Sequence, residues 1–132
     1  MTRDPVDILQ RGYELMWLEG DFDRAVGGLG EDFEWFVPGV PGGEMRRGPE
    51  GTKDFFREWL EPWEDHRIEW EIRRAGDDRV VVLSVMHARG RASGAEVEMH
   101  LGQVWTFSGG RAVRMVAYNS HEEALAAAGL AP

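Results

Sequence analysis

Residues 13–21 read YELMWLEGD, and this stretch sets how the first part of the chain is organised. It ends an amphipathic helix that begins near Pro5 and carries apolar residues every three or four positions. Gly20 is suited to ending that helix, since glycine accepts the left-handed backbone often found at a helix end. Asp21 is suited to capping the next helix, because its carboxylate accepts hydrogen bonds from N–H groups of a first turn. The chain therefore opens with two helices in succession.

The rest of the chain places helices before long strands. The helices expected after Gly20 cover residues 22–29, 49–63 and 122–128. The strands expected from two-residue alternation cover residues 33–38, 67–74, 80–91, 96–107 and 113–119. Helices followed by an antiparallel sheet predict an α+β fold in which the sheet wraps around N-terminal helices and encloses an apolar pocket. We expect one domain over residues 1–132.

Composition limits the classes of partner. The net charge of −9 disfavours binding to nucleic acid or to anionic membranes, because no basic field offsets phosphate repulsion. The absence of cysteine excludes disulfides, thiolate catalysis and thiolate metal sites. No apolar run approaches the ~20 residues that span a bilayer. The first ten residues lack the apolar core of a signal peptide, so we expect a cytoplasmic protein.

Aromatic residues predict the lining of the pocket. The chain has six tryptophans among 132 residues, and core packing is the ordinary explanation for such residues. If they line a cavity instead, a small apolar or aromatic ligand is the expected partner. The side chains expected on the inner faces are Trp17, Trp35, Phe55, Trp59, Leu83, Met99 and Trp105.

Five polar side chains are expected in or near this pocket. Gln103 lies in the middle of an apolar strand face, where its amide needs a partner such as Tyr13, the backbone or a ligand. His87 alternates onto the face that we predict to be internal, as a general base or as a hydrogen-bonded core residue. Arg89 follows on the same face, to pair with a ligand carboxylate or to reach solvent. Asn119 ends the last strand, at the pocket mouth or in a turn.

A metal site is not expected. His100 alternates with Glu98 on the other face of its strand, but no third ligand follows at a recognisable spacing. We therefore expect no metal and no organic cofactor.

A homodimer is expected. The apolar second face of the strand over residues 80–91 needs a cover, and no remaining helix looks long enough to provide it. A partner copy is the simplest cover for the residues assigned to that face, namely Val80, Val82, Met86, Val104 and Val116.

Four segments resemble a known family: YELMWLEGD at 13–21, DFEWFVP at 32–38, GPEGTKDFFREW at 48–59 and YNSHEEALAAAGL at 118–130. They are similar to the SnoaL-like branch of the nuclear transport factor 2-like superfamily, which includes ketosteroid isomerases and polyketide cyclases. The resemblance covers nearly the whole chain. It implies a cone-shaped curved sheet, open at one end to an apolar pocket, and a homodimer.

The same resemblance assigns roles to three positions. Tyr13 and Gln103 fall where ketosteroid isomerases place the two hydrogen-bond donors of their oxyanion hole, so they could jointly hold a carbonyl or hydroxyl oxygen. The general-base aspartate of those enzymes is replaced by Val37. Because valine cannot take a proton, isomerisation through that base is not expected.

Two functions are compatible with these residues. One is an isomerase, cyclase or dehydratase that acts on a small, mostly apolar molecule by proton transfer at His87, with Tyr13 and Gln103 holding an oxygen. The other is a non-catalytic module for small-ligand binding or dimerisation. The three polar groups favour the first function and Val37 favours the second. We predict that Tyr13, His87 and Gln103 converge on one point.

Overall fold

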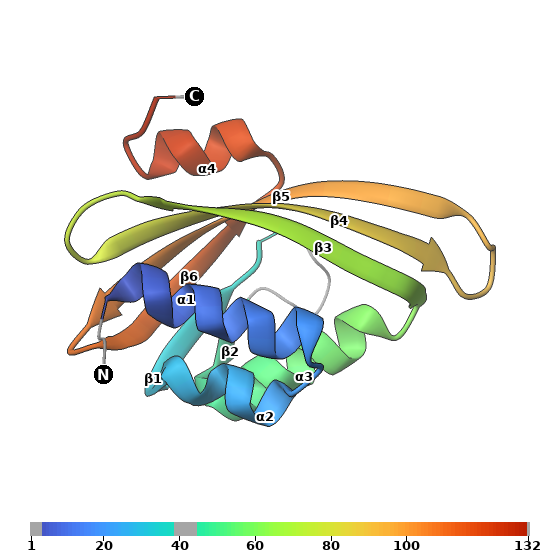
Figure 1. Cartoon of the computed structure of the whole chain (residues 1–132), viewed down its shortest axis with the longest axis horizontal. Coiled ribbons are helices and arrows are strands. Elements are labelled where there is room, and N and C mark those ends of the chain that lie inside the picture. The colour runs from blue at the N-terminus through green and yellow to red at the C-terminus, as the bar shows by residue number, and fades with distance from the viewer. Residues whose placement is uncertain (1–3, 39–44, 132) are drawn as a thin grey trace.

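A curved six-stranded sheet carries helices on both of its faces in the computed structural model, which describes residues 4–38 and 45–131 (Figure 1). The helical elements are α1 (Pro5–Tyr13), the π-helical turn η1 (Glu14–Leu18), α2 (Phe22–Ala25), the 3-10 turn η2 (Val26–Gly28), α3 (Gly48–Leu60) and α4 (His121–Ala127). The strands are β1 (Leu29–Phe36), β2 (Arg46–Arg47), β3 (Trp63–Arg74), β4 (Arg79–Gly90), β5 (Glu96–Ser108) and β6 (Arg111–Tyr118). Elements α1, α2 and α3 lie on the concave side of the sheet, and α4 lies on the opposite side.

The N-terminal helices begin and end where their residues predict. Asp4 accepts a hydrogen bond from the backbone N–H of Val6 at 2.9 Å, and Asp21 accepts one from the N–H of Arg24 at 3.1 Å. Gly20 has a φ of 67°, the left-handed conformation expected after the first helix. The π-helical turn η1 was not predicted. It follows Tyr13 directly, and such turns are frequent at functional sites.

The sheet has the order β2-β1-β6-β5-β4-β3. Strands β3, β4, β5 and β6 pair antiparallel, as predicted. β1 pairs parallel with β6, so the sheet is mixed rather than wholly antiparallel. The short strand β2 was missed by the sequence analysis, because two arginines carry no alternation; it pairs with the outer edge of β1. The glycine-rich segment 39–44 lies outside the described residues.

The two faces of β4 belong to two different apolar clusters. Val80 and Val82 pack with α1, β1 and the inner face of β5, whereas Val81 and Leu83 pack against α4. The sequence pattern predicted the opposite assignment, with the face of Leu83 internal and the face of Val80 and Val82 external. Because β4 is central in the sheet and covered on both sides, its apolar residues alternate without indicating which face is internal.

The outer face of the sheet is covered in part by helix α4, and not by a partner copy alone as predicted. Helix α4 has only seven residues, yet Ala124, Leu125 and Ala128 pack over Val81, Leu83 and Val104. The apolar patch that led us to expect a partner copy is therefore partly covered by α4 and partly internal, since Val80, Val82 and Met86 are fully buried. None of the described helices is both long and apolar enough to cross a membrane.

Candidate functional site

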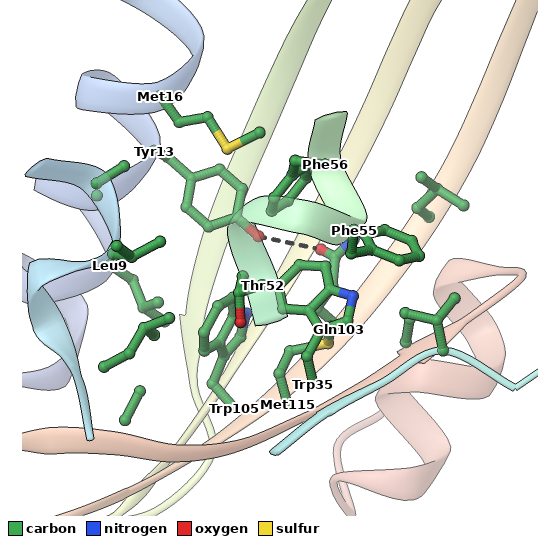
Figure 2. A pocket seen from close by; sticks show the side chains of 18 of the residues that line it. Leu9, Tyr13, Met16, Trp35, Thr52, Phe55, Phe56, Gln103, Trp105 and Met115 are labelled. Atoms are coloured by element: carbon green, nitrogen blue, oxygen red, sulfur yellow. Dashed lines mark hydrogen bonds between the residues drawn. The ribbon is translucent and has the colours of Figure 1, made fainter. Parts of the chain in front are cut away.

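A cavity of about 250 Å³ lies between the N-terminal helices, α3 and the concave face of the sheet (Figure 2). Helix α1 and the turn η1 supply one wall, α3 supplies a second, and β1, β5 and β6 supply the third. Seven aromatic side chains contribute to the lining: Tyr13, Trp17, Trp35, Phe55, Phe56, Trp59 and Trp105. Tyr118 borders the cavity, but its side chain packs with the cluster beneath α4.

The lining is almost free of ionisable groups. Within residues 4–38 and 45–131, the cavity is lined by no Asp, Glu, His, Lys or Arg. Among the described side chains that face it, the titratable group is the phenol of Tyr13, because the ring of Tyr118 packs with the cluster beneath α4. The other polar side chains include Gln103 and Thr52, with Asn119 exposed at the edge. A proton could therefore be exchanged with a bound molecule only by a phenol or by water.

Helix α3 places its aromatic residues by ordinary helical spacing. Thr52, Phe55, Phe56 and Trp59 are three, four and seven positions apart, so they share one face. The rings of Phe55 and Trp59 stack at 6.3 Å, and Trp35 of β1 contacts Phe56 edge-on at 4.9 Å. This packing fixes the rings before any ligand enters.

Tyr13 and Gln103 meet inside the cavity. The phenol of Tyr13 donates a hydrogen bond to Oε1 of Gln103 over 3.3 Å, as the dashed line in Figure 2 shows. Burial raises the pKa of the Tyr13 phenol far above its ordinary value, so the group is neutral and protonated at physiological pH. The N–H of Trp105 lies close enough to the phenol oxygen to oppose this rise in pKa, although it is not in hydrogen-bond geometry.

Two indole N–H groups in the lining have no acceptor. Trp35 and Trp105 are more than nine-tenths buried, and neither ring nitrogen has a hydrogen-bond partner in the described part of the chain. Trp70, by contrast, donates to Oε1 of Gln10 at 2.9 Å. Buried indoles usually find such a partner, so the two unpaired groups set this cavity apart from the rest of the core.

Most of the predicted site residues lie in the lining. The structure places there Tyr13, Trp17, Trp35, Phe55, Trp59, Met99, Gln103, Trp105 and Asn119. Gln103 shares a face of β5 with Met99 and Trp105, as the alternation predicted. Their part in binding or catalysis stays a prediction.

The predicted placement of three residues is wrong. His87 lies on the outer face of the sheet, where its Nε2 is 3.3 Å from Glu69 and its Nδ1 is 3.6 Å from Glu98. It therefore does not converge with Tyr13 and Gln103. Leu83 packs against α4 on that same face. Arg89 forms an ion pair with Asp65 at 2.9 Å, close to the end of β4. One reversed assignment of the faces of β4 caused all three errors.

Other lining residues were missed. Thr52 and Phe56 could have been found from helical spacing, because Thr52 lies three positions before Phe55 and Phe56 lies three positions before Trp59. Met16 projects from the π-helical turn η1, whose altered spacing the sequence does not reveal. On the outer face, His100 bonds to Glu98 at 2.8 Å, but the described residues include no group of three His, Cys, Asp or Glu side chains that could hold a metal.

The model of the SnoaL-like domain family matches residues 9–115. The chain belongs to this family. The matched region includes every cavity-lining element except the start of α1 and the end of β6. No curated protein matches this SnoaL-like chain in sequence.

Solved structures confirm the fold of the SnoaL-like chain. An NTF2-like protein from Burkholderia thailandensis E264 is 20% identical with a TM-score of 0.79, and the match covers 98% of this chain and 100% of that one. TerC co-crystallised with polyporic acid is 21% identical with a TM-score of 0.77, over 92% and 95% of the two chains. A protein of ketosteroid isomerase-like fold from Catenulispora acidiphila DSM 44928, in complex with trimethylamine, is 15% identical with a TM-score of 0.72, over 93% of each chain. At these identities the likeness shows the fold alone.

Proposed function

We propose that this SnoaL-like chain binds a small, uncharged, largely aromatic molecule in the cavity, and that it does so without proton transfer by its own side chains. The observation that carries the proposal is a lining with seven aromatic side chains and, among the described residues, no charged ones. A charged ligand would lose its hydration there without gaining a partner of opposite charge, which is costly. A neutral aromatic ligand gains buried apolar area and contacts with rings that are already in place.

Catalysis by proton transfer has little support from this cavity. A general base must lie within hydrogen-bond reach of the proton that it takes. By the resemblance to ketosteroid isomerases, Val37 falls where those enzymes have their general-base aspartate. His87 lies on the outer face of the sheet. The raised pKa of Tyr13 makes its phenol a poor base or acid near neutral pH. The non-catalytic function, which was the alternative reading of the sequence, is therefore the better supported one.

An enzymatic role is the second candidate, and one contact favours it. The Tyr13–Gln103 pair can hold an oxygen on which negative charge develops, as in an isomerase or cyclase. Some of the similar structures are named as candidate polyketide cyclases, and TerC was co-crystallised with polyporic acid. These names support a small-molecule role for the chain more than a particular reaction. In such an enzyme, water or the substrate would have to supply the base.

Calorimetry with two probes of one shape tests the proposal. Fluorene is flat, aromatic and uncharged, whereas fluorene-9-carboxylate adds one negative charge to the same ring system. We expect fluorene to bind with an affinity that is constant from pH 6 to pH 9, and the carboxylate to bind much more weakly. Tighter binding of the carboxylate, or no binding of any neutral aromatic probe of this size, would refute the proposal. Turnover of a ketone or epoxide substrate would support the enzymatic alternative instead.

The homodimer and the cytoplasmic location predicted from the sequence stay predictions. The outer face of β3, β4 and β5 beyond α4 carries side chains of opposite charge, among them Arg67 beside Glu69. Opposite charges on one surface can pair with the same surface of a second copy across a two-fold axis. A dimer through this face would be held by polar contacts rather than by the apolar patch that the sequence suggested.

A further inference from the structure

We propose that the ligand presents a carbonyl oxygen to the amide nitrogen of Gln103, and that Tyr13 is the positioning residue that turns this amide toward the cavity. The inference rests on the proposed function, because it names the chemical class of the molecule in the same cavity. It assigns the direct contact with the ligand to Gln103 and gives Tyr13 a supporting role.

The first step is the direction of the bond between the two residues. The Tyr13 phenol donates its only proton to Oε1 of Gln103. That proton is therefore not available to a ligand. Because Oε1 faces the phenol, the other end of the same amide, Nε2 with its two N–H groups, faces away from it.

The second step is the reason why the amide is not turned the other way. If Nε2 of Gln103 faced the phenol instead, it would donate to the phenol oxygen, and the phenol proton would have no acceptor among the described residues. A buried polar group without a partner is costly, so the orientation with Oε1 toward Tyr13 is favoured.

The third step is the excess of donors that this orientation leaves. No described residue accepts a hydrogen bond from Nε2 of Gln103, which is half-buried in the lining. The N–H groups of Trp35 and Trp105 also lack acceptors. Thr52 is not placed to accept these hydrogen bonds, because its side chain is only 2% exposed and its hydroxyl donates to the backbone oxygen of Gly48. The polar groups around Gln103 therefore supply hydrogen-bond donors, and a ligand there should bring a hydrogen-bond acceptor.

A carbonyl group meets this need better than a hydroxyl group of the same size. A ketone, quinone or lactone oxygen accepts from Nε2 and brings no proton of its own. An alcohol can also accept, but its own O–H then has no acceptor near Gln103. One unpaired donor weakens binding by about tenfold or more.

The test is calorimetry with three probes of one ring system: fluorene, 9-fluorenone and 9-fluorenol. We expect 9-fluorenone to bind about tenfold more tightly than 9-fluorenol. The carbonyl stretch of bound 9-fluorenone should also move to lower frequency than in an apolar solvent, as it does when a carbonyl accepts a hydrogen bond. Failure of all three probes to bind would contradict the proposed function. Binding of all three with equal affinity, or a preference for the alcohol, would overturn only the inference.

Two variants separate the contact residue from the positioning residue. Gln103→Leu should abolish both the preference for the ketone and the shift of its carbonyl stretch, while fluorene still binds. Tyr13→Phe frees the amide to turn, so the ketone and the alcohol should bind within about threefold of each other. Gln103→Met serves if the leucine variant does not fold, and fluorene binding reports an intact cavity in each case.

A matched control variant is Gln10→Leu. Gln10 is also an amide that pairs with an aromatic side chain, Trp70, but it lies outside the lining. Its substitution should leave the preference for the ketone unchanged. If Tyr13→Phe keeps the full preference for the ketone, then Tyr13 does not position the amide. If Gln103→Leu keeps the shifted carbonyl stretch, another group holds the oxygen. Either result overturns the proposal.

Discussion

A Cβ atom on Gly102 would lie 2.4 Å from the Cβ of Ala124 and 3.2 Å from the backbone oxygen of Ser120. The backbone of strand β5 therefore lies directly against the Ala124 methyl group of helix α4 and the Ser120 carbonyl at this point. The contact is possible only because residue 102 has no side chain. It holds α4 over the outer face of the sheet, where its apolar residues cover Val81 and Leu83.

Substitution of Gly102 by Ala should push α4 away from β5. An inserted methyl group in such a contact costs roughly 1–3 kcal/mol, so we expect the free energy of unfolding to fall by that amount. Chemical denaturation measures it. The matched control is Gly27→Ala, because a Cβ at Gly27 meets nothing within 4 Å. An unchanged stability for Gly102→Ala would show that α4 does not dock as described.

Substitution of Trp59 by Ala should weaken the binding of fluorene. Trp59 is half-buried, lines the cavity and stacks on Phe55. A lost aromatic contact is worth about 1 kcal/mol, so the dissociation constant should rise about fivefold. Trp63→Ala is the control, since Trp63 is equally half-buried but lies outside the lining. Equal effects of the two variants on binding would argue against this cavity as the binding site.

The phenol of Tyr13 should make the protein less stable in alkali. Its pKa is raised by burial above the ordinary value of 10.0, so above about pH 10 the unfolded chain releases a proton that the folded protein keeps. The free energy of unfolding therefore falls as the pH rises through that range, and is unaffected by this group at pH 8. Tyr13→Phe should remove part of the fall. A fall of the same size in Tyr13→Phe and in the unaltered protein would contradict the effect of burial.

Light scattering at micromolar concentration should give about twice the chain mass of 14.9 kDa. Because the outer face beyond α4 is charged, the dimer should weaken as the salt concentration rises. Reversal of one charge, as in Arg67→Glu, should favour the monomer, whereas Arg24→Glu, on α2, should not. A charge at Val104 would instead displace α4, since Val104 lies beneath that helix. A monomeric mass at low salt would refute the dimer.

Much of the architecture could be predicted from local signals. Asp4, Gly20 and Asp21 mark helix ends by their own chemistry, and the alternation in β5 placed Gln103 on the inner face correctly. The faces of β4 could not be assigned, because both faces of a central strand are apolar and the alternation does not name the inner one. That single ambiguity moved His87 into a cavity that it does not reach. The π-helical turn after Tyr13 and the role of α4 depend on tertiary packing, which no short segment encodes.

The parallel pairing of β1 with β6 also constrains when the protein can fold as it is made. Trp35 of β1 lies beside Met115 of β6, and about eighty residues of chain separate these partners. A nascent chain that has not yet reached β6 can pair β1 only with the two residues of β2 in the described sheet. Its aromatic residues therefore remain without one wall of the core until β6 has left the ribosome. Unlike a helical bundle, which can close turn by turn, this domain completes its core only with its last strand, and the apolar surface that is exposed until then favours aggregation.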